Sequence, residues 1–571
     1  MKQIKPLALL LLLPISAAQG ALYLTEYDDS YTLDNGLIQL TLSKDGDAVS
    51  LYKDGVNMVD NLSGVSTDPN KHRSFYLDYH TGISGGATNF YPSSVNILRN
   101  DNKQIHIQFI GSSDDHILLE YHYIMKPDVS GIYSYVVADN VKDETTQIAE
   151  LRTVYRFDSE LMPHLHNGRI LATPPSYATL EASTKIQDET WLLDNGEIYS
   201  KYDLADYQRE TNIWGVLGSG FGAWVISAGT DYFSGGALNQ ELLVHQDGIA
   251  LNYLTGAHLG SPDMFAPADW HKVYGPWLLY INHHENDSTL IDDARLQAEK
   301  EIKQWPYKWV TDERYPIKRG QLKGQVSSDA PLMINLANDA ESSFDRQTLG
   351  YYYSARTDAK GHYDIDNIIP GQYELTAYAL TGSEPGVLYS HPVTIGHNTT
   401  KLSFEIPRNE LETIWNIGQA NRRGDEFYLA NKPRNYIWHT ESPADLTYII
   451  GQSQPDKDWY FVQSTPGTWR VEFTLSKVTD SLLNVAIAAA SNFGMGADST
   501  KPELAIRVNG SLLTVLNYEN DKAVYRSAMQ SGRYHNEKLD IPAHMLIDGE
   551  NNIELEVLGG AFIYDTINLQ Q

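Results

Sequence analysis

The chain has 571 residues, no cysteine, and 73 Asp and Glu against 43 Lys and Arg, which gives a formal net charge of −30. The lack of cysteine excludes disulfides, thiolate metal sites and cysteine nucleophiles. The acidic balance argues against a nucleic-acid partner, because phosphates need a basic surface. A chain of this length is expected to form two to four domains of roughly 100 to 250 residues.

Residues 1–20 have the pattern of a secretory signal peptide. Lys2 and Lys5 form a charged start, an apolar run extends from Pro6 to Ile15, and small residues follow up to Gly20. About ten apolar residues are too few to span a membrane. We therefore expect cleavage at the end of this segment and a secreted, extracellular protein, exported through the periplasm, with no membrane association after cleavage.

Residues 21–312 are predicted to form one large β domain. Short β-branched and aromatic runs alternate with turns, among them the hairpin signals Asn35-Gly36 and Asp54-Gly55. The alternation continues to Trp277–Asn282, which gives too many strands for a simple immunoglobulin sandwich. We expect a large sandwich of two extended sheets, closed by a helix over Asp292–Val310 that Pro306 stops.

Two smaller β units are predicted to follow. Residues 313–408 contain strands with strong hairpin chemistry, which favours a fibronectin III-like sandwich. We assign Asp358, Asp364 and Asp366 of this unit to turns and caps, since neither their spacing nor a closing glutamate fits a calcium loop. Residues 409–571 contain evenly spaced strand-like segments, typical of a jelly roll.

Basic and aromatic residues concentrate between Leu151 and Tyr280, inside a chain that is otherwise acidic. The notable positions in order are Arg152 and Arg156 in LRTVYRF, Lys201 between Tyr199 and Tyr202, the Trp214-Gly215 step, and Tyr253 followed by His258. Cations beside aromatic rings suit an anionic, ring-shaped substrate. The stretch therefore predicts a binding surface for such a molecule.

The order and separations of these positions resemble the rhamnogalacturonan lyases of polysaccharide lyase family 4, which break a pectic polysaccharide by β-elimination. The resemblance covers nearly all of the chain after residue 20, and Ile414–Phe427 and the final AFIYDTINL carry it into the last unit. It implies a galactose mutarotase-like super-sandwich for the first domain and a carbohydrate-binding-like jelly roll for the last. It also implies rhamnogalacturonan I as the polymer that the protein binds.

The resemblance also implies roles for single residues. Lys201 and His258 fall on the catalytic positions of the family, and Arg152, Arg156, Gly215 and Tyr253 on positions that bind substrate. Gly215 is interpreted as a place where substrate approaches the backbone closely.

The two arginines have a chemical rationale of their own. β-Elimination removes the proton on C5, α to a carboxylate, and a bound guanidinium stabilises the negative charge that develops there. Residues four apart on a strand share one face, so Arg152 and Arg156 can point the same way. Without the resemblance, an RxxxR pair would be interpreted as solvent-facing charges.

A base and a proton donor complete the reaction. Neighbouring cations and burial lower the pKa of a lysine from roughly 10.4 towards neutrality, which suits Lys201 as the base. Histidine titrates near neutral pH and can protonate the departing oxygen. We assign that role to His258, with His245 as the second candidate; the reverse assignment of base and acid stays open.

Two other functions compete with the lyase: a glycoside hydrolase that uses paired carboxylates, and a non-catalytic protein that binds acidic polysaccharide. Trp214, Tyr253 and Trp270 are candidates for stacking on sugars, with burial in the sandwich as the alternative. We expect a monomer that requires no cofactor. Structural calcium is left open.

Overall fold

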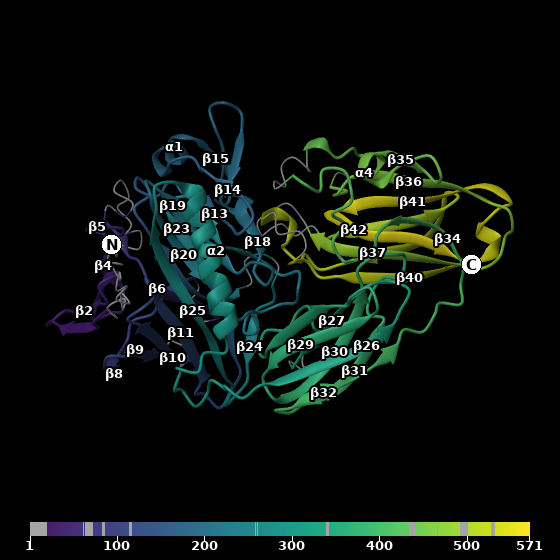
Figure 1. The fold of residues 1–571 in the computed structure, drawn as a ribbon. Helices are drawn as coiled ribbons and strands as arrows, with labels where there is room; N and C mark the ends of the chain where they lie inside the picture. The colour runs from purple at the N-terminus through teal and green to yellow at the C-terminus, as the bar shows by residue number, and fades with distance from the viewer. Residues whose placement is uncertain are drawn as a thin grey trace, which may run out of the picture.

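The computed structural model describes residues 20–60, 62, 72–82, 86–112, 117–256, 259, 261–338, 342–432, 440–464, 466–491, 501–526 and 531–571. The predicted signal peptide lies outside these residues, apart from Gly20. The described strands fall into three groups along the chain, which form three neighbouring bodies in Figure 1. The prediction of a mainly β fold is confirmed; the domain bounds given above stay predictions.

The N-terminal domain is a sandwich of two large sheets. The first, which we call the β25 sheet, contains in spatial order and over the described residues β14 (Leu171–Ala172), β13 (His164–His166), β19 (Ile213–Gly218), β20 (Phe221–Ile226), β25 (His271–His283), β11 (Gly131–Asn140), β10 (Ile117–Met125), β9 (Ile105–Ser112) and β8 (Ser94–Asn100). The second, the β12 sheet, contains β22 (Val244–His245), β23 (Ile249–Gly256), β12 (Thr146–Arg156), β6 (Tyr76–Thr81) and β7 (Thr88–Asn89), and β24 (Met264–Ala266) also pairs with β12.

Three smaller sheets flank this sandwich in the described part of the domain. They are β1 (Tyr23–Glu26), β2 (Ser30–Asp34), β3 (Gln39–Ser43), β4 (Ala48–Lys53) and β5 (Val56–Asn57); then β15 (Thr184–Gln187), β16 (Thr190–Leu192) and β17 (Ile198–Ser200); and β18 (Ala205–Tyr207) with β21 (Gln240–Leu242). The two predicted hairpin turns are confirmed, because Gly36 and Gly55 sit between paired strands with φ of 77° and 84°.

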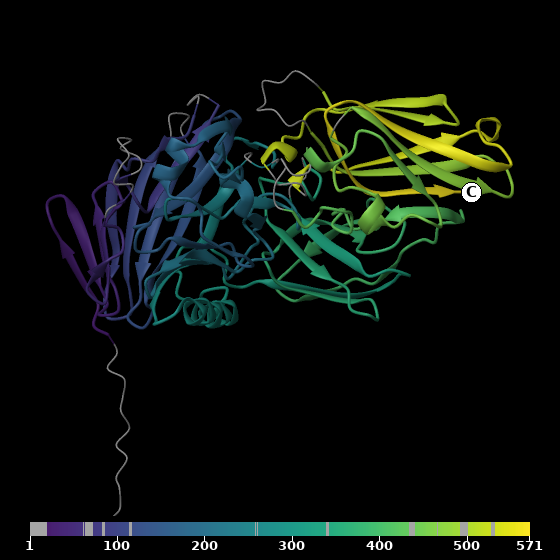
Figure 2. The ribbon, with the colours of Figure 1, turned by 90° about the horizontal axis from the view of Figure 1, so that it is seen from above.

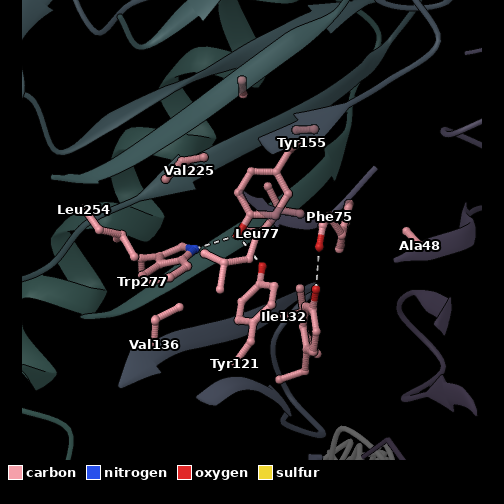
Figure 3. Close-up of a cluster of buried hydrophobic side chains, with 14 of the residues drawn as sticks. Ala48, Phe75, Leu77, Tyr121, Ile132, Val136, Tyr155, Val225, Leu254 and Trp277 are labelled. Atoms are coloured by element: carbon pink, nitrogen blue, oxygen red, sulfur yellow. Dashed lines mark hydrogen bonds between the residues drawn. The ribbon is translucent and has the colours of Figure 1, made fainter. Parts of the chain in front are cut away.

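The core of the domain lies between the two large sheets (Figure 3). Trp277 of β25 crosses it and donates through its indole N–H to the hydroxyl of Tyr155 on β12 at 2.7 Å. Tyr123 of β10 donates to the carbonyl of Phe75 at 2.7 Å. Buried aromatic rings thus fill the space while their polar groups stay hydrogen-bonded.

The outer face of the β25 sheet is covered by α2 (Asp287–Gln304), which Figure 2 shows end-on against the sandwich. Leu290, Ala294 and Ala298 of α2 join a buried apolar cluster with residues of β11, β19 and β25. The helix begins five residues earlier than predicted, because Asn286 caps it by accepting from the Thr289 N–H at 2.9 Å. It ends two residues before Pro306, and in the described part of the chain no helix is both long and apolar enough to cross a membrane.

The second group of strands forms a smaller sandwich. One sheet contains β29 (His362–Ile368), β26 (Gly320–Ser327) and β32 (Thr399–Lys401), with β33 (Phe404–Glu405) also on β26; the other contains β28 (Tyr352–Arg356), β27 (Leu332–Ala337), β30 (Gly371–Ala379) and β31 (Tyr389–Ile395). Asp358 accepts from the backbone N–H of Lys360 and of His362, both at 2.8 Å, so its predicted turn role is confirmed.

The third group forms the C-terminal sandwich. Its described sheets are β34 (Thr413–Gly418), β42 (Ala561–Gln570), β37 (Ser481–Ser491) and β40 (His535–Ile541), and β35 (Leu446–Ile449), β36 (Gly467–Leu475), β41 (Gly549–Gly559), β38 (Glu503–Val508) and β39 (Ser511–Asn517). The short helices among the described residues are α1 (Tyr177–Ala182), α4 (Pro455–Asp458) and the 3-10 turns η2 (Lys201–Leu204), η3 (Val524–Arg526) and η5 (Ala543–Met545). Trp459 and Trp469 lie in the core of this unit.

The three bodies contact one another through buried ion pairs and hydrogen bonds. Arg319, in the link to the second unit, pairs with Asp231 of the N-terminal domain at 2.7 Å. Arg422 of the C-terminal unit forms an ion pair with Asp345 of the second unit. Ser531 of the C-terminal unit hydrogen-bonds the backbone of Gln240 in the N-terminal domain. Each unit thus touches both of the others.

Candidate functional site

The predicted cations gather on the outer face of the β12 sheet. On β12 the side chains of Leu151 and Tyr155 belong to the core between the sheets, whereas Val154 belongs to a separate cluster on the other side. Arg152 and Arg156 share that outer side with Val154. The prediction that the four-residue spacing places both arginines on one face is therefore confirmed.

Arg152 is held by a carboxylate of the neighbouring strand. Its Nε and Nη2 donate to the two oxygens of Asp78 on β6, at 2.8 and 2.9 Å, and Glu150 Oε1 lies 3.4 Å from Nη2. Burial disfavours the guanidinium charge, but Asp78 and Glu150 outweigh burial and raise the pKa of Arg152 above its usual value. Arg152 is therefore a fixed and already paired cation.

Arg156 is the less engaged of the two cations. Its Nε and Nη2 both donate to the hydroxyl of Tyr76 at 3.3 Å, and Asp247 Oδ2 lies 3.6 Å from its Nη1. These contacts are longer than the bidentate pair of Arg152, and the hydroxyl carries no charge. Of the two arginines, Arg156 can more readily turn its guanidinium towards an incoming anion.

Lys201 opens the 3-10 turn η2 next to this sheet. Ser200 caps the turn by accepting from the Tyr202 N–H at 3.3 Å, while Asp203 accepts from the Ser200 N–H at 3.1 Å. The Lys201 N–H donates to the carbonyl of Glu189 at 2.9 Å. The backbone of Lys201 is thus fixed at the end of β17.

The surroundings of the Lys201 amine match the sequence-based expectation. Burial, and then the charge of Arg152, lower the pKa of Lys201 to about 8, against the opposite pull of Glu189, Asp188 and Glu150. Among the described residues no side-chain hydrogen bond or ion pair holds its Nζ, which lies 5.7 Å from the ring centroid of Tyr202. An amine with these properties can take up a proton near neutral pH.

Tyr253 lies on β23 and is buried in the outer cluster with Tyr76, Val154 and Tyr202. Its hydroxyl accepts from Arg152 Nη1 at 2.7 Å. Because its ring is buried, Tyr253 does not stack on a sugar in this conformation. Its contribution is to orient Arg152.

Of the two histidine candidates, the structure describes His245, whereas His258 lies outside the described residues. His245 on β22 lies within reach of the cations: burial, followed by the charges of Lys201, Arg156 and Arg152, holds its pKa well below the usual value. Its Nδ1 lies 3.0 Å from the carbonyl of Gln246 and must donate to it. A neutral imidazole in this tautomer presents Nε2 as an acceptor, which suits His245 less well to the role of proton donor.

Gly215 has a structural reason of its own, and its role in substrate binding stays a prediction. It lies buried in β19 of the β25 sheet, and a Cβ at this position would stand 2.0 Å from the carbonyl oxygen of Ala223 on β20. The close approach of the neighbouring strand by itself requires a glycine here. The stacking role considered for Trp214 is wrong, because Trp214 is fully buried and donates to the carbonyl of Leu251 at 2.6 Å.

Trp270, the remaining stacking candidate, is half-buried and donates through its indole N–H to the carbonyl of Leu349 at 3.0 Å. Its stacking role stays untested.

One described group has the residue types and spacing of a metal site: Glu120, His122 and Asp312. Arg314 occupies it, because its guanidinium donates to both carboxylates at 2.6 to 3.0 Å. A cation already neutralises these acids, so the group does not fit a calcium ion.

Several charged residues of the site carry no local sequence signal. Asp78, Glu150 and Asp188 are single acids in an acidic chain, and only strand pairing and chain folding bring them to the arginines and the lysine. Glu241 on β21 lies near Tyr253, and burial raises the pKa of its carboxyl to about 8. Sequence reasoning could not distinguish these acids from the others.

Comparison with known proteins extends this picture. Family models match residues 14–165 (rhamnogalacturonate lyase family), 322–401 (polysaccharide lyase family 4, domain II) and 413–569 (polysaccharide lyase family 4, domain III). The chain is 47% identical over 566 residues to a rhamnogalacturonate lyase of Dickeya dadantii (strain 3937), an alignment that covers 99% of this chain and 97% of that protein.

A rhamnogalacturonate lyase B of Emericella nidulans is 24% identical, over 95% of this chain and 94% of its own length. The similarity to the Dickeya protein extends through all three units and confirms the resemblance inferred from the arginine, lysine and glycine motifs. The chain belongs to the rhamnogalacturonate lyase family, polysaccharide lyase family 4.

Proposed function

We propose that the protein is a rhamnogalacturonan lyase that cleaves the bond between rhamnose and galacturonate in the backbone of rhamnogalacturonan I by β-elimination. A base removes the C5 proton of galacturonate, the C4–O4 bond breaks, and a C4=C5 double bond forms. The departing rhamnose oxygen takes up a proton. The products are an unsaturated galacturonate end and a new rhamnose end.

The observation that carries the proposal is the Lys201 amine beside paired cations on the outer face of the β12 sheet. A pKa of about 8 leaves a useful fraction of the amine unprotonated near neutral pH. We assign the removal of the C5 proton to Lys201. The rate should therefore fall about tenfold per pH unit as the pH drops below 8, since the protonated amine is inactive.

The two arginines have different roles, since one acts on the substrate carboxylate and the other on Lys201. Arg156, with its longer and uncharged hydrogen bonds to Tyr76, binds the carboxylate and stabilises the charge that develops on it. Arg152, locked by Asp78, lowers the proton affinity of Lys201 without leaving its place. His258 is assigned as proton donor from the sequence, because the neutral His245 does not suit that role.

Ultraviolet absorbance of the unsaturated uronate, followed during incubation with rhamnogalacturonan I, tests the proposal. We expect absorbance to rise with the native protein. The rate of this rise should be lower by a factor of about 10² to 10⁴ with Lys201→Ala and with His258→Ala. Lys303→Ala is the matched control, because the Lys303 side chain is 76% exposed on α2, far from the β12 sheet.

Two outcomes would contradict the lyase. New reducing ends without absorbance would mean that water attacks, as in a glycoside hydrolase. Retained polymer binding with neither signal would mean a protein that binds acidic polysaccharide without cleaving it.

Secretion, a monomeric state and independence from metal complete the proposal. The signal-like segment at 1–20 supports export, and Arg156 supplies the positive charge that a metal would bring to the carboxylate. Treatment with EDTA should leave the initial rate unchanged. A lowered melting temperature at unchanged rate would indicate a structural calcium ion.

A further inference from the structure

A turn of the C-terminal unit reaches the neighbourhood of Lys201. Arg526, at the end of η3, donates from Nη2 to Asp188 Oδ2 of the N-terminal domain at 2.8 Å. The two side chains are only 17% and 22% exposed. In Figure 1 the yellow C-terminal part of the chain approaches the N-terminal domain beside β18. This ion pair joins residues 338 positions apart in the sequence.

Asp188 connects Arg526 to the turn that carries Lys201. The hydroxyl of Tyr202 donates to the same oxygen, Asp188 Oδ2, at 2.7 Å. The guanidinium carbon of Arg526 also lies 5.0 Å from the ring centroid of Tyr202. Tyr202 directly follows Lys201, so the position of Asp188 bears on the position of the lysine.

The charge of Asp188 opposes the function proposed for Lys201. Burial alone would raise the pKa of Asp188, but hydrogen bonds from Tyr202 and Arg526 outweigh burial and keep the carboxyl ionised. An ionised carboxylate near Lys201 favours the protonated amine. A protonated Lys201 cannot act as a base, so this carboxylate needs a competing cation.

We propose that Arg526 is a positioning residue that the C-terminal unit supplies to the active site: by pairing with Asp188, it holds Tyr202 in place and prevents Asp188 from forming an ion pair with Lys201. The inference rests on the proposed role of Lys201 as base. It gives the C-terminal unit a part in the reaction in addition to any binding of carbohydrate.

The other charged groups that face Lys201 come from the elements around it. Arg152 and Glu150 face it from β12, Glu189 from the turn before β16, and the neutral His245 from β22. Three carboxylates of the described residues, Asp188 among them, therefore act on the amine against the charge of Arg152. Arg526 offsets one of the three, which is why its loss should change the proton affinity of Lys201 measurably.

The C-terminal unit also contacts the N-terminal domain at two other points among the described residues. Arg423 Nη2 donates to Glu210 at 2.7 Å and its guanidinium lies 4.6 Å from the ring centroid of Tyr207. Ser531 and the backbone of Gln240 exchange hydrogen bonds of 2.6 and 3.3 Å. These contacts do not involve Arg526, so the units should stay in contact when Arg526 is replaced.

The test compares full-length Arg526→Gln, Asp188→Asn and the double variant by the pH dependence of kcat/KM on rhamnogalacturonan I. For Arg526→Gln we expect the acidic limb of the profile to move to higher pH by about half a pH unit to one pH unit. This shift corresponds to a three- to tenfold loss of kcat/KM at pH 7. In the double variant the acidic limb should lie at the native pH position or at lower pH, because the Asp188 carboxylate that favours protonated Lys201 is then absent.

Arg533→Gln is the matched control, since Arg533 is an exposed arginine of the same unit. Melting temperatures of all variants show whether a lower rate reflects unfolding. A limb that stays in place in Arg526→Gln, or a loss of rate that Asp188→Asn does not reverse, would overturn the proposal. Activity that survives in Lys201→Ala would instead overturn the assigned base, which the Arg526 series alone cannot do.

Discussion

The two large sheets of the N-terminal domain present outer faces of opposite character. The β25 sheet buries an apolar face under α2, where Leu290 and Ala294 pack on it. The β12 sheet instead holds the largely buried charged side chains of Arg152, Arg156 and Asp78. Both faces need a cover, but one is covered by a helix and the other by the polar segment that contains Lys201.

The comparison shows where the fold has retained charge at the expense of stability. Apolar residues of similar volume in place of a buried ion pair are often neutral or stabilising. A sheet face with paired charges is therefore weak evidence for stability and better evidence for binding. The Glu301 carboxylate on the α2 side differs, because Tyr133 and Tyr307 both donate to it and it remains an isolated, satisfied acid in an apolar layer.

Lys201→Met should give the largest effect and separate activity from stability. Loss of the base should lower kcat by about 10² to 10⁴. The native lysine has a folded-state pKa of about 8, below the unfolded value of roughly 10.4. Its destabilising effect is therefore fully present below pH 8 and is relieved as the pH rises towards 10.

At pH 7 the methionine variant should consequently be more stable by about 2 kcal/mol, as measured by urea unfolding. The gain should shrink as the pH approaches 10. A variant that loses both activity and stability would mean that Lys201 is a structural residue, and the contrast between the two faces would lose its functional meaning.

Asp78→Asn should destabilise the β12 face most. It leaves the buried Arg152 with Glu150 at 3.4 Å as its remaining carboxylate partner, and removal of one partner from a buried pair typically costs about 3 kcal/mol or more. Urea unfolding at pH 7 measures the change. Asp54→Asn is the control. The Asp54 side chain, which pairs with His283, is 53% exposed, so its replacement should change the free energy of unfolding by less than about 1 kcal/mol.

Leu290→Ala tests the apolar face. Truncation of a fully buried leucine between α2 and the β25 sheet should cost about 2 to 4 kcal/mol. At a temperature where the variant is folded, kcat/KM should match that of the native protein, because the change lies behind the core. If kcat/KM falls although the variant is fully folded, the two faces are coupled.

The fold could be predicted from the sequence largely because its signals are local. Alternating runs and the Asn35-Gly36 and Asp54-Gly55 turns identify strands and hairpins, and the spacing of Arg152 and Arg156 places them on one face. The start of α2 was missed because its cap, Asn286, lies ahead of the strongly helical stretch.

The site could be predicted only in part because its electrostatics are non-local. Asp78 reaches Arg152 through the pairing of β6 with β12, and Arg526 reaches Asp188 across a domain boundary. No pattern in a single acidic sequence marks these partners. Gly215 shows the same limit, because a glycine is required equally by a ligand and by a close neighbouring strand, and only the geometry reveals the strand.

Arg156→Lys should give the smallest effect and is the most specific for the binding role of the β12 face. Lysine keeps the charge but loses the planar fork that matches a carboxylate. We expect KM for rhamnogalacturonan I to rise about tenfold with a smaller loss of kcat, and stability within about 1 kcal/mol of the native value, because Arg156 has longer contacts than Arg152. If kcat falls instead while KM is unchanged, Arg156 interacts with the carboxylate only in the transition state, and the face binds its substrate through other residues.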